Sequence, residues 1–98
     1  MDELELKFKE LLKQWKDETK TSSFVSKMTS TKSYKDIIDL GPSVIPLLLK
    51  ELQTNPNWYF DALRILSNED PHKAGHEGKL IDLANDWIEW GKKKKYIK

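Results

Sequence analysis

Two segments that are apolar on most of their sides, residues 43–53 and 56–67, follow each other with almost no linker between them. Pro46 falls in the first turn of the first segment, where a helix has no backbone hydrogen bond to lose. Asn55 and Pro56 suit the cap and the first turn of a second helix. That second segment carries its polar side chains at steps of three and four residues, at Asn57, Asp61, Arg64 and Asn68. Because only this narrow stripe can face water, we expect a largely buried antiparallel helical hairpin at the centre of the fold.

Further helices are predicted on both sides of this hairpin. Residues 2–19 repeat apolar side chains at helical steps and begin with acidic residues, which the helix dipole favours there. A shorter helix is expected over residues 34–40, with Ser33 and Asp36 as a capping box. A last helix is expected over residues 77–93, with a broad apolar face. The predicted polar face of this last helix comprises Asp82, Asn85, Asp86, Glu89 and Lys93.

The connecting segments differ in composition from the predicted helices. Residues 20–33 are rich in Ser and Thr, which favour turns and caps, so they are predicted to form a linker. The apolar residues Phe24, Val25 and Met28 are expected to hold this linker against the body of the protein. A single domain, residues 1–98, is therefore expected to comprise an N-terminal helix (1–19), the linker (20–33), a helical core (34–94) and a basic end (95–98).

The composition supports an all-α fold, a compact bundle of about five helices. The chain has 98 residues, which is enough for one domain with a modest core. Aromatic residues make up 10% of the sequence, and only 4 Gly and 4 Pro occur, which argues for packing rather than disorder. The absence of Cys, of a long apolar segment and of a signal sequence favours a cytoplasmic protein that does not span a membrane.

The sequence GPSVIPLLLKELQTNPNWYFDALRIL, residues 41–66, resembles a HEAT-type repeat, in which a helix with an early Pro precedes an Asn-Pro turn and a second helix. The elements GPxxxPLLLxEL and WxxWG also resemble small stand-alone bacterial proteins of unassigned function. These resemblances imply a helical hairpin but no activity. Where HEAT arrays usually have small and charged residues, this chain has Trp58, Tyr59 and Phe60. Solenoids need about three repeats, so we expect a closed bundle whose terminal helices cover the hairpin.

The polar loop after the hairpin, residues 68–78, contains the candidate metal ligands and acid–base groups. These candidates are His72, His76, Glu69, Asp70 and Glu77. The two histidines have a spacing that suits zinc on a helix, but Pro71 and Gly75 disfavour a regular helix there. Without Cys or a third His, the pattern predicts a solvated loop and neither a metal nor a cofactor. No nucleophile and no glycine-rich phosphate loop accompany these residues, so an enzyme is not expected.

The surplus of large aromatic side chains favours a protein–protein interaction module that binds another protein or itself. Trp and Tyr are frequent anchors of interfaces, although the same side chains could all be used in the core. The candidate contact residues are Trp58, Tyr59, Asp61, Arg64, Trp87 and Trp90. Such a module could act as an inhibitor, an adaptor or an antitoxin-like neutraliser, and no small-molecule substrate is expected.

The alternative function is a nucleic-acid-binding accessory protein. Its contact residues would be Lys92, Lys93, Lys94 and Lys95. Residues 92–98 carry five Lys and no acid, whereas residues 56–91 carry seven acids and three bases, a net charge of −4. The predicted helical body has no strong basic excess, and clustered Lys and Arg supply most of the affinity for a phosphate backbone. Protein binding is therefore favoured over nucleic-acid binding.

Overall fold

The computed structural model describes residues 2–22 and 24–98, whose regular structure is entirely helical. The elements are α1 (Glu3–Thr19), α2 (Val25–Met28), α3 (Lys32–Asp39), the 3₁₀ helix η1 (Pro42–Val44), α4 (Ile45–Thr54), α5 (Phe60–Ser67) and α6 (Leu80–Lys93). Five of the six α-helices have at least eight residues, and the described residues include no strand. The predicted all-α bundle is confirmed. None of the described helices has the length and apolar character needed to cross a bilayer.

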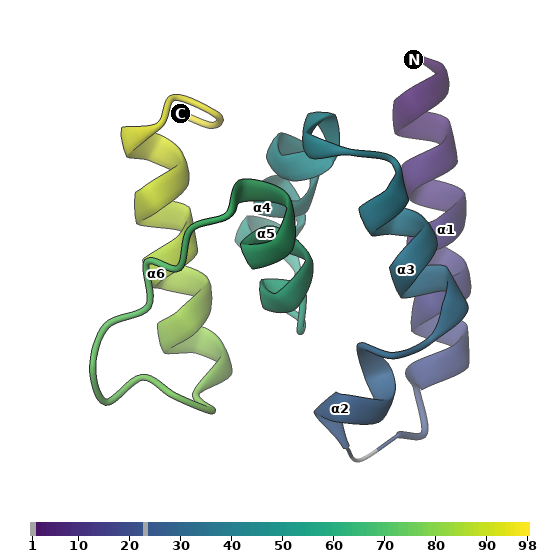
Figure 1. Cartoon of the computed structure of the whole chain (residues 1–98), viewed down its shortest axis with the longest axis horizontal. Helices are drawn as coiled ribbons and strands as arrows, with labels where there is room; N and C mark the ends of the chain where they lie inside the picture. Colours follow the sequence, from purple (N-terminus) through teal and green to yellow (C-terminus); the bar gives the residue numbers. More distant parts are fainter. Residues whose placement is uncertain (1, 23) are drawn as a thin grey trace.

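Figure 1 shows α1 and α6 at opposite sides of the molecule, with α4 and α5 between them. α1 packs mainly against α3, and α4 packs mainly against α6, while α3 also contacts α5 and so joins the two halves. The buried apolar side chains come from all five longer helices. The radius of gyration is 12.8 Å, which matches the value of about 13 Å expected for a compact domain of this length. The helices therefore close around one core.

Three buried aromatic rings join the N-terminal half of the chain to the α4–α5 pair. Trp15 of α1 has no exposed surface, and its ring centroid lies 5.5 Å from that of Tyr34 and 5.4 Å from that of Tyr59. The indole Nε1 of Trp15 donates a hydrogen bond of 2.6 Å to the carbonyl oxygen of Met28. A buried indole N–H needs such an acceptor, so this bond fixes the end of α2 against α1.

The hydroxyl of Tyr34 caps the start of α5 from a distant part of the chain. It accepts a hydrogen bond from the Ala62 amide at 3.0 Å and donates one to the Trp58 carbonyl oxygen at 3.1 Å. Ala62 lies in the first turn of α5, where backbone amides have no partner within the helix. A neighbouring side chain usually satisfies such an amide, but Tyr59, in the N-cap position, provides no side-chain cap. The cap of α5 is therefore a tertiary contact.

The second helix of the predicted hairpin begins later than the sequence predicts. α5 starts at Phe60, and residues 55–59 form an irregular turn, so the expected start at Pro56 is wrong. The Asn57 side chain accepts a hydrogen bond of 2.8 Å from the Trp58 amide, and such local bonds compete with helical ones. Trp58 consequently lies on a turn rather than on a helix face.

The start of α3 also differs from the prediction. Its cap is Thr31, whose hydroxyl accepts a hydrogen bond of 3.3 Å from the Tyr34 amide, and not the expected pair Ser33 and Asp36. Ser33 is completely buried, and its hydroxyl donates a hydrogen bond of 3.1 Å to the Glu18 carboxylate on α1. Ser33 therefore serves the α1–α3 contact, which a local capping pattern does not reveal.

A short helix, α2, interrupts the segment that we predicted to be a linker. Of the three apolar residues expected to hold this segment in place, Met28 packs against the core. The other two do not: Phe24 is 62% exposed and Val25 is 37% exposed. The segment is held by the packing of Met28, by the bond from the Trp15 indole to the Met28 carbonyl oxygen and by the bond from Ser33 to Glu18, and Phe24 and Val25 remain at the surface.

The WxxWG sequence lies at the contact between α6 and α4. Gly91 approaches α4 so closely that a Cβ atom at this position would lie 2.6 Å from Cδ1 of Leu49. After α6 the chain reverses at Lys95, which has a left-handed φ of 66°, and the Tyr96 amide donates to the Gly91 carbonyl oxygen. Ile97 is then buried beside the same glycine. The basic end of the chain therefore folds back onto α6.

We predict that Tyr34→Phe lowers the free energy of unfolding by about 1–3 kcal/mol, because it leaves the Ala62 amide and the Trp58 carbonyl oxygen without their partner. Urea denaturation followed by circular dichroism measures this change. Tyr59→Phe is the matched control, because the buried Tyr59 hydroxyl has no hydrogen-bond partner among the described residues. That variant should be as stable as the parent or more stable. Equal losses in both variants would contradict the capping role of Tyr34.

Candidate functional site

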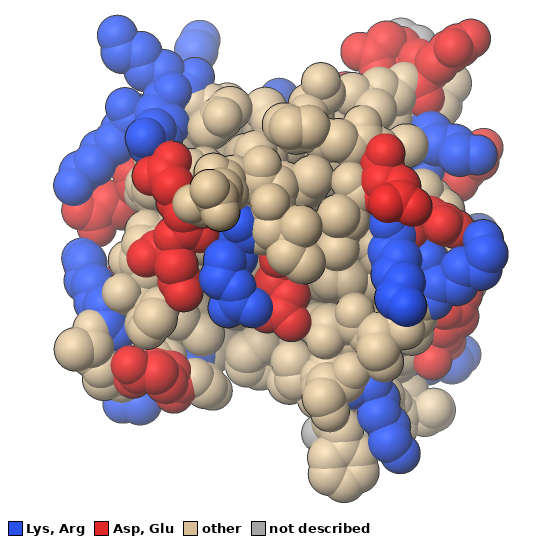
Figure 2. Space-filling model, viewed as in Figure 1, with Lys and Arg blue, Asp and Glu red and all other residues tan. Residues whose placement is uncertain are grey.

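A groove opens between α2, α5, α6 and the loop of residues 68–79, and its volume is about 220 Å³. In Figure 1, α2 and the later part of this loop lie at the end of the molecule opposite to both termini. Figure 2 shows mainly uncharged atoms over the middle of the face in this view, with charged side chains toward its sides. The groove is the site to which four separate segments of the chain contribute apolar and charged groups.

Apolar side chains from three helices and one turn line the groove: Val25, Trp58, Phe60, Leu83 and Trp87. Trp87 is only 1% exposed, so it belongs to the core and supplies the floor. Trp58 is half-buried and packs edge to face on Phe60, with ring centroids 5.8 Å apart and an interplanar angle of 89°. This contact packs the Trp58 ring against another side chain of the groove lining. Trp58 is thus the large aromatic side chain that the groove offers to a binding partner.

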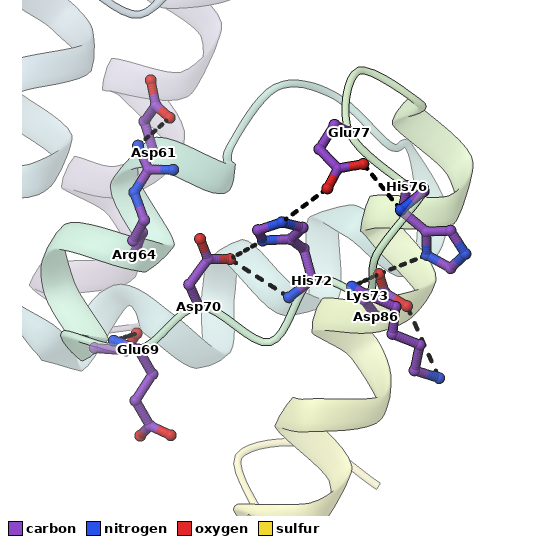
Figure 3. A network of polar contacts seen from close by, with 11 residues as sticks. Asp61, Arg64, Glu69, Asp70, His72, Lys73, His76, Glu77 and Asp86 are labelled. Carbon is purple, nitrogen blue, oxygen red and sulfur yellow. Dashed lines mark hydrogen bonds and ion pairs between the residues drawn. The ribbon is translucent and has the colours of Figure 1, made fainter.

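Charged side chains from α5 and the loop form the rim of the groove. Arg64 pairs with Asp61, one turn away on α5, at 2.8 Å. His72 lies between two carboxylates (Figure 3): its Nδ1 is 2.8 Å from Asp70 and its Nε2 is 3.5 Å from Glu77. Three acids and one Arg give the lining a net charge of −2 when His72 is neutral. The rim therefore favours a partner that carries positive charge.

The two carboxylates beside His72 favour its protonated form. The hydrogen bond with Asp70 is the main cause that raises the pKa of His72 above 6.5, and the charges of Asp70 and Glu77 add to it. Partial burial alone would raise the pKa of Asp70, but the hydrogen bonds from His72 outweigh it and lower this pKa below 3.8. Because the pKa of His72 is higher in the folded than in the unfolded state, protonation of His72 stabilises the fold. This stabilisation is complete below pH 6.5 and is lost as the pH rises through the folded-state pKa.

Asp86 holds the loop of residues 68–79 against α6 (Figure 3). We predicted an exposed position for Asp86, but it is only 4% exposed. Its Oδ2 accepts a hydrogen bond of 3.0 Å from the Lys73 amide and lies 2.7 Å from Nδ1 of His76. Burial would raise the pKa of Asp86, but these contacts outweigh it and lower the pKa below 3.8. The prediction failed because the loop folds back over the helix, which helical periodicity cannot show.

His72 and His76 contact different carboxylates and do not face a common point. His72 pairs with Asp70, whereas His76 pairs with Asp86 on α6. α6 begins at Leu80 and not at residue 77, so no described helix carries both histidines. In residues 2–22 and 24–98, no group of three or more His, Cys, Asp and Glu side chains is placed to hold a metal ion. The described residues that line the groove include no hydroxyl or thiol nucleophile.

The structure brings together four of the six predicted contact residues: Trp58, Asp61, Arg64 and Trp87 line the groove. The other two, Tyr59 and Trp90, are buried at other places in the core and do not line it. Tyr59 packs on Trp15, and the Trp90 indole donates a hydrogen bond of 3.2 Å to Glu69. The broad aromatic surface expected from the sequence is therefore reduced to one accessible Trp over an apolar floor.

Sequence reasoning did not identify the remaining lining residues as contact residues: Val25, Phe60, Asp70, His72, Glu77 and Leu83. Val25 and the loop residues reach the groove only because their segments fold toward α5 and α6. The unusual run of three aromatic residues at positions 58–60 was the one local signal that pointed to this region. Nothing in the spacing of the loop residues indicated that they would face that run.

The lysine cluster at residues 92–95 lies at the C-terminal end of α6, beside the start of the loop of residues 68–79, and is partly neutralised (Figure 1). Lys93 lies 3.7 Å from Glu89, and Lys94 lies 3.2 Å from Glu69. Tyr96 stacks on Trp90 with ring centroids 5.5 Å apart, so one face of this indole is covered within the protein. These contacts reduce both the charge and the stacking surface that a nucleic acid could use.

Comparison of the chain with protein-family models, with curated proteins and with solved structures finds no match. The groove itself is therefore the basis for inferring a function. The groove suits binding because it combines an apolar floor, a charged rim and the half-buried Trp58. Its lining includes one histidine and three carboxylates but no hydroxyl or thiol nucleophile.

We predict that Asp86→Ala lowers the free energy of unfolding by about 1–3 kcal/mol, because it leaves the Lys73 amide without its acceptor and His76 without its partner. Urea denaturation measures the loss, and hydrogen exchange should show faster exchange in residues 68–79. Asn85→Ala is the control, since Asn85 lies on the same helix with an exposed side chain and should change stability by less than about 0.5 kcal/mol. Equal exchange in both variants would exclude Asp86 as the anchor of the loop.

We also predict that the difference in stability between the parent protein and Asp86→Ala shrinks in acid. A lowered carboxyl pKa gives stability that is present above pH 3.8 and is lost as the pH falls through the folded-state value. Unfolding curves at pH 6 and at about pH 2.5 test this expectation. A difference that stays constant between these two conditions would show that the charge of Asp86 has no role.

Proposed function

We propose that the chain is a non-enzymatic protein-binding module and that the groove around Trp58 is its contact site. The observation that carries this proposal is a half-buried Trp beside a buried apolar floor, under a rim of ion-paired side chains. Trp, Tyr and Arg are enriched among interface hot spots, which cluster in well-packed pockets that are desolvated in the complex. Trp58 is half-buried in the groove, and Arg64 lies at its exposed rim.

The size of the groove favours a side chain of a protein partner over a small-molecule substrate. Small-molecule pockets usually have volumes of about 300–1,000 Å³. The groove has a volume of about 220 Å³, which suits one or two bulky apolar side chains. The surrounding Asp61, Asp70 and Glu77 would orient a partner that carries Lys or Arg next to the apolar anchor.

Inhibitor, adaptor and neutraliser roles are all compatible with such a contact, because each requires the partner surface to be covered and no chemical step. A chain without cysteine suits the reducing cytoplasm, which is the location that we propose. We also propose that the α4–α5 pair is a single HEAT-like unit. In a solenoid such a pair packs between neighbouring repeats, whereas here the α4–α5 pair packs against α3 and α6 of the same domain.

We predict that Trp58→Ala weakens partner binding at least about tenfold, as expected for a hot-spot residue. Tagged protein is used for affinity capture from the native cell, and captured partners are then titrated against purified variants. Leu6→Ala is the matched control, because Leu6 is 48% exposed on α1 and does not line the groove. Circular dichroism verifies that both variants fold. Unchanged affinity in folded Trp58→Ala would refute the groove as the contact site.

The nucleic-acid alternative is tested separately by titrating single- and double-stranded DNA and RNA at two salt concentrations. Our proposal predicts no binding beyond a weak, salt-sensitive attraction to the lysine cluster. Simultaneous replacement of Lys92 and Lys95 by Glu is the diagnostic variant. Tight binding that this replacement abolishes would favour the alternative over the protein-binding function.

A further inference from the structure

The corner formed by α2 presents an exposed aromatic side chain. Phe24 precedes α2 and is 62% exposed, and the ammonium group of Lys27 lies 5.3 Å from the centre of its ring. The end of α2 is anchored by the bond from the buried Trp15 indole to the Met28 carbonyl oxygen. The corner is therefore attached to the core and presents an apolar ring together with a positive charge.

This corner lies directly beside the groove. Val25, the next residue after Phe24, is itself part of the groove lining. Phe24 nevertheless does not line the groove of its own chain and remains largely exposed. A projecting apolar group and an apolar recess thus lie side by side on one surface of the molecule.

The chemistry of the corner complements the chemistry of the groove. Lys27 gives the corner a positive charge, whereas the three acids and one Arg of the groove lining give it a net charge of −2 when His72 is neutral and −1 when it is protonated. An aromatic ring paired with a Lys is the kind of group that an apolar floor with an acidic rim accepts. Both features are present on every copy of the chain.

We propose that two copies of the chain form a symmetric dimer in which the Phe24 corner of each copy docks into the groove of the other. This inference rests on the proposed binding role of the groove and names a second copy as an occupant. Because the corner and the groove are adjacent, a two-fold axis beside them allows both contacts to form at once and closes the assembly. Each site is completed by a residue of the partner copy.

The reciprocal contact has a regulatory consequence. Occupation of the groove by a second copy excludes any other protein that uses Trp58 as an anchor. Two small docking sites make a modest interface, so the dimer should form reversibly and in a concentration-dependent manner. Dilution would then release monomers whose grooves are free, and partner binding would compete with self-association.

Sedimentation equilibrium of the full chain over a wide concentration range tests the proposal. The parent protein should show a monomer–dimer equilibrium, and Phe24→Ala should raise its dissociation constant by about tenfold or more. Ser26→Ala, an exposed change within the same short helix, is the matched control and should leave the equilibrium unchanged. A parent protein that is monomeric at every concentration, or a dimer that Phe24→Ala does not weaken, would overturn the proposal.

Mixing two defective variants tests the reciprocal geometry. Phe24→Ala lacks the docking side chain and Trp58→Ala lacks the aromatic wall of the groove, so each variant alone has no complete contact. A mixed dimer retains one complete contact, between the Phe24 of one chain and the intact groove of the other. The mixture should therefore associate more strongly than either variant alone, and equal association would exclude the reciprocal arrangement.

A charge exchange provides an independent test that does not depend on apolar packing. Lys27→Glu should weaken the dimer, because the new carboxylate meets the acidic rim of the other copy. Glu77→Lys in the same chain should restore much of the lost affinity, and a failure to restore it would exclude an ion pair between Lys27 and Glu77 of the two copies.

The effect of Phe24→Ala also separates this inference from the proposed function. This variant should leave binding of a foreign partner unchanged or stronger, whereas Trp58→Ala should weaken both. Monomeric protein whose Phe24 instead mediates binding to anionic vesicles would overturn the dimer.

Discussion

The buried contact between Trp15, Tyr34 and Tyr59 is the constraint on which the rest of the structure depends. Trp15 fixes the end of α2 through its indole N–H, and Tyr34 satisfies the first turn of α5 through its hydroxyl. These two hydrogen bonds connect segments that are 13 and 28 residues apart in the chain. Because buried polar groups need partners, the bonds allow few alternative arrangements of the segments that they join.

The position of the groove follows from this constraint. The hydroxyl of Tyr34 also restrains the turn before α5, because it donates a hydrogen bond to the Trp58 carbonyl oxygen. This bond positions the backbone that carries the Trp58 side chain. On the other side, Asp86 draws the loop of residues 68–79 onto α6 and brings its charged residues toward the rim. The apolar floor is core that the fold leaves accessible between these two anchored segments.

The candidate site was only partly predictable from the sequence. Trp58, Asp61, Arg64 and Trp87 were identified as candidate contact residues from their chemical character, but nothing in the sequence indicated that they would meet. Tyr59 and Trp90 have the same chemical character, and no local pattern separated them from the residues that line the groove. Their burial depends on which neighbours cover them, namely Trp15 for Tyr59 and the reversed C-terminal segment for Trp90. Asp86 was misplaced for the same reason.

The wide burial expected for the second helix of the hairpin is wrong at Ile65, which is 60% exposed. The sequence by itself determined the all-α class, the tolerance of Pro46 in a first helical turn and the buried apolar face of α4. These features depend on apolar periodicity and on backbone chemistry, which act over a few residues. Only the tertiary structure decided where α5 begins, which residue caps α3 and which aromatic side chains remain accessible. Those outcomes depend on hydrogen bonds and packing between distant segments, because a polar group or a ring has no fixed environment until the chain has folded around it.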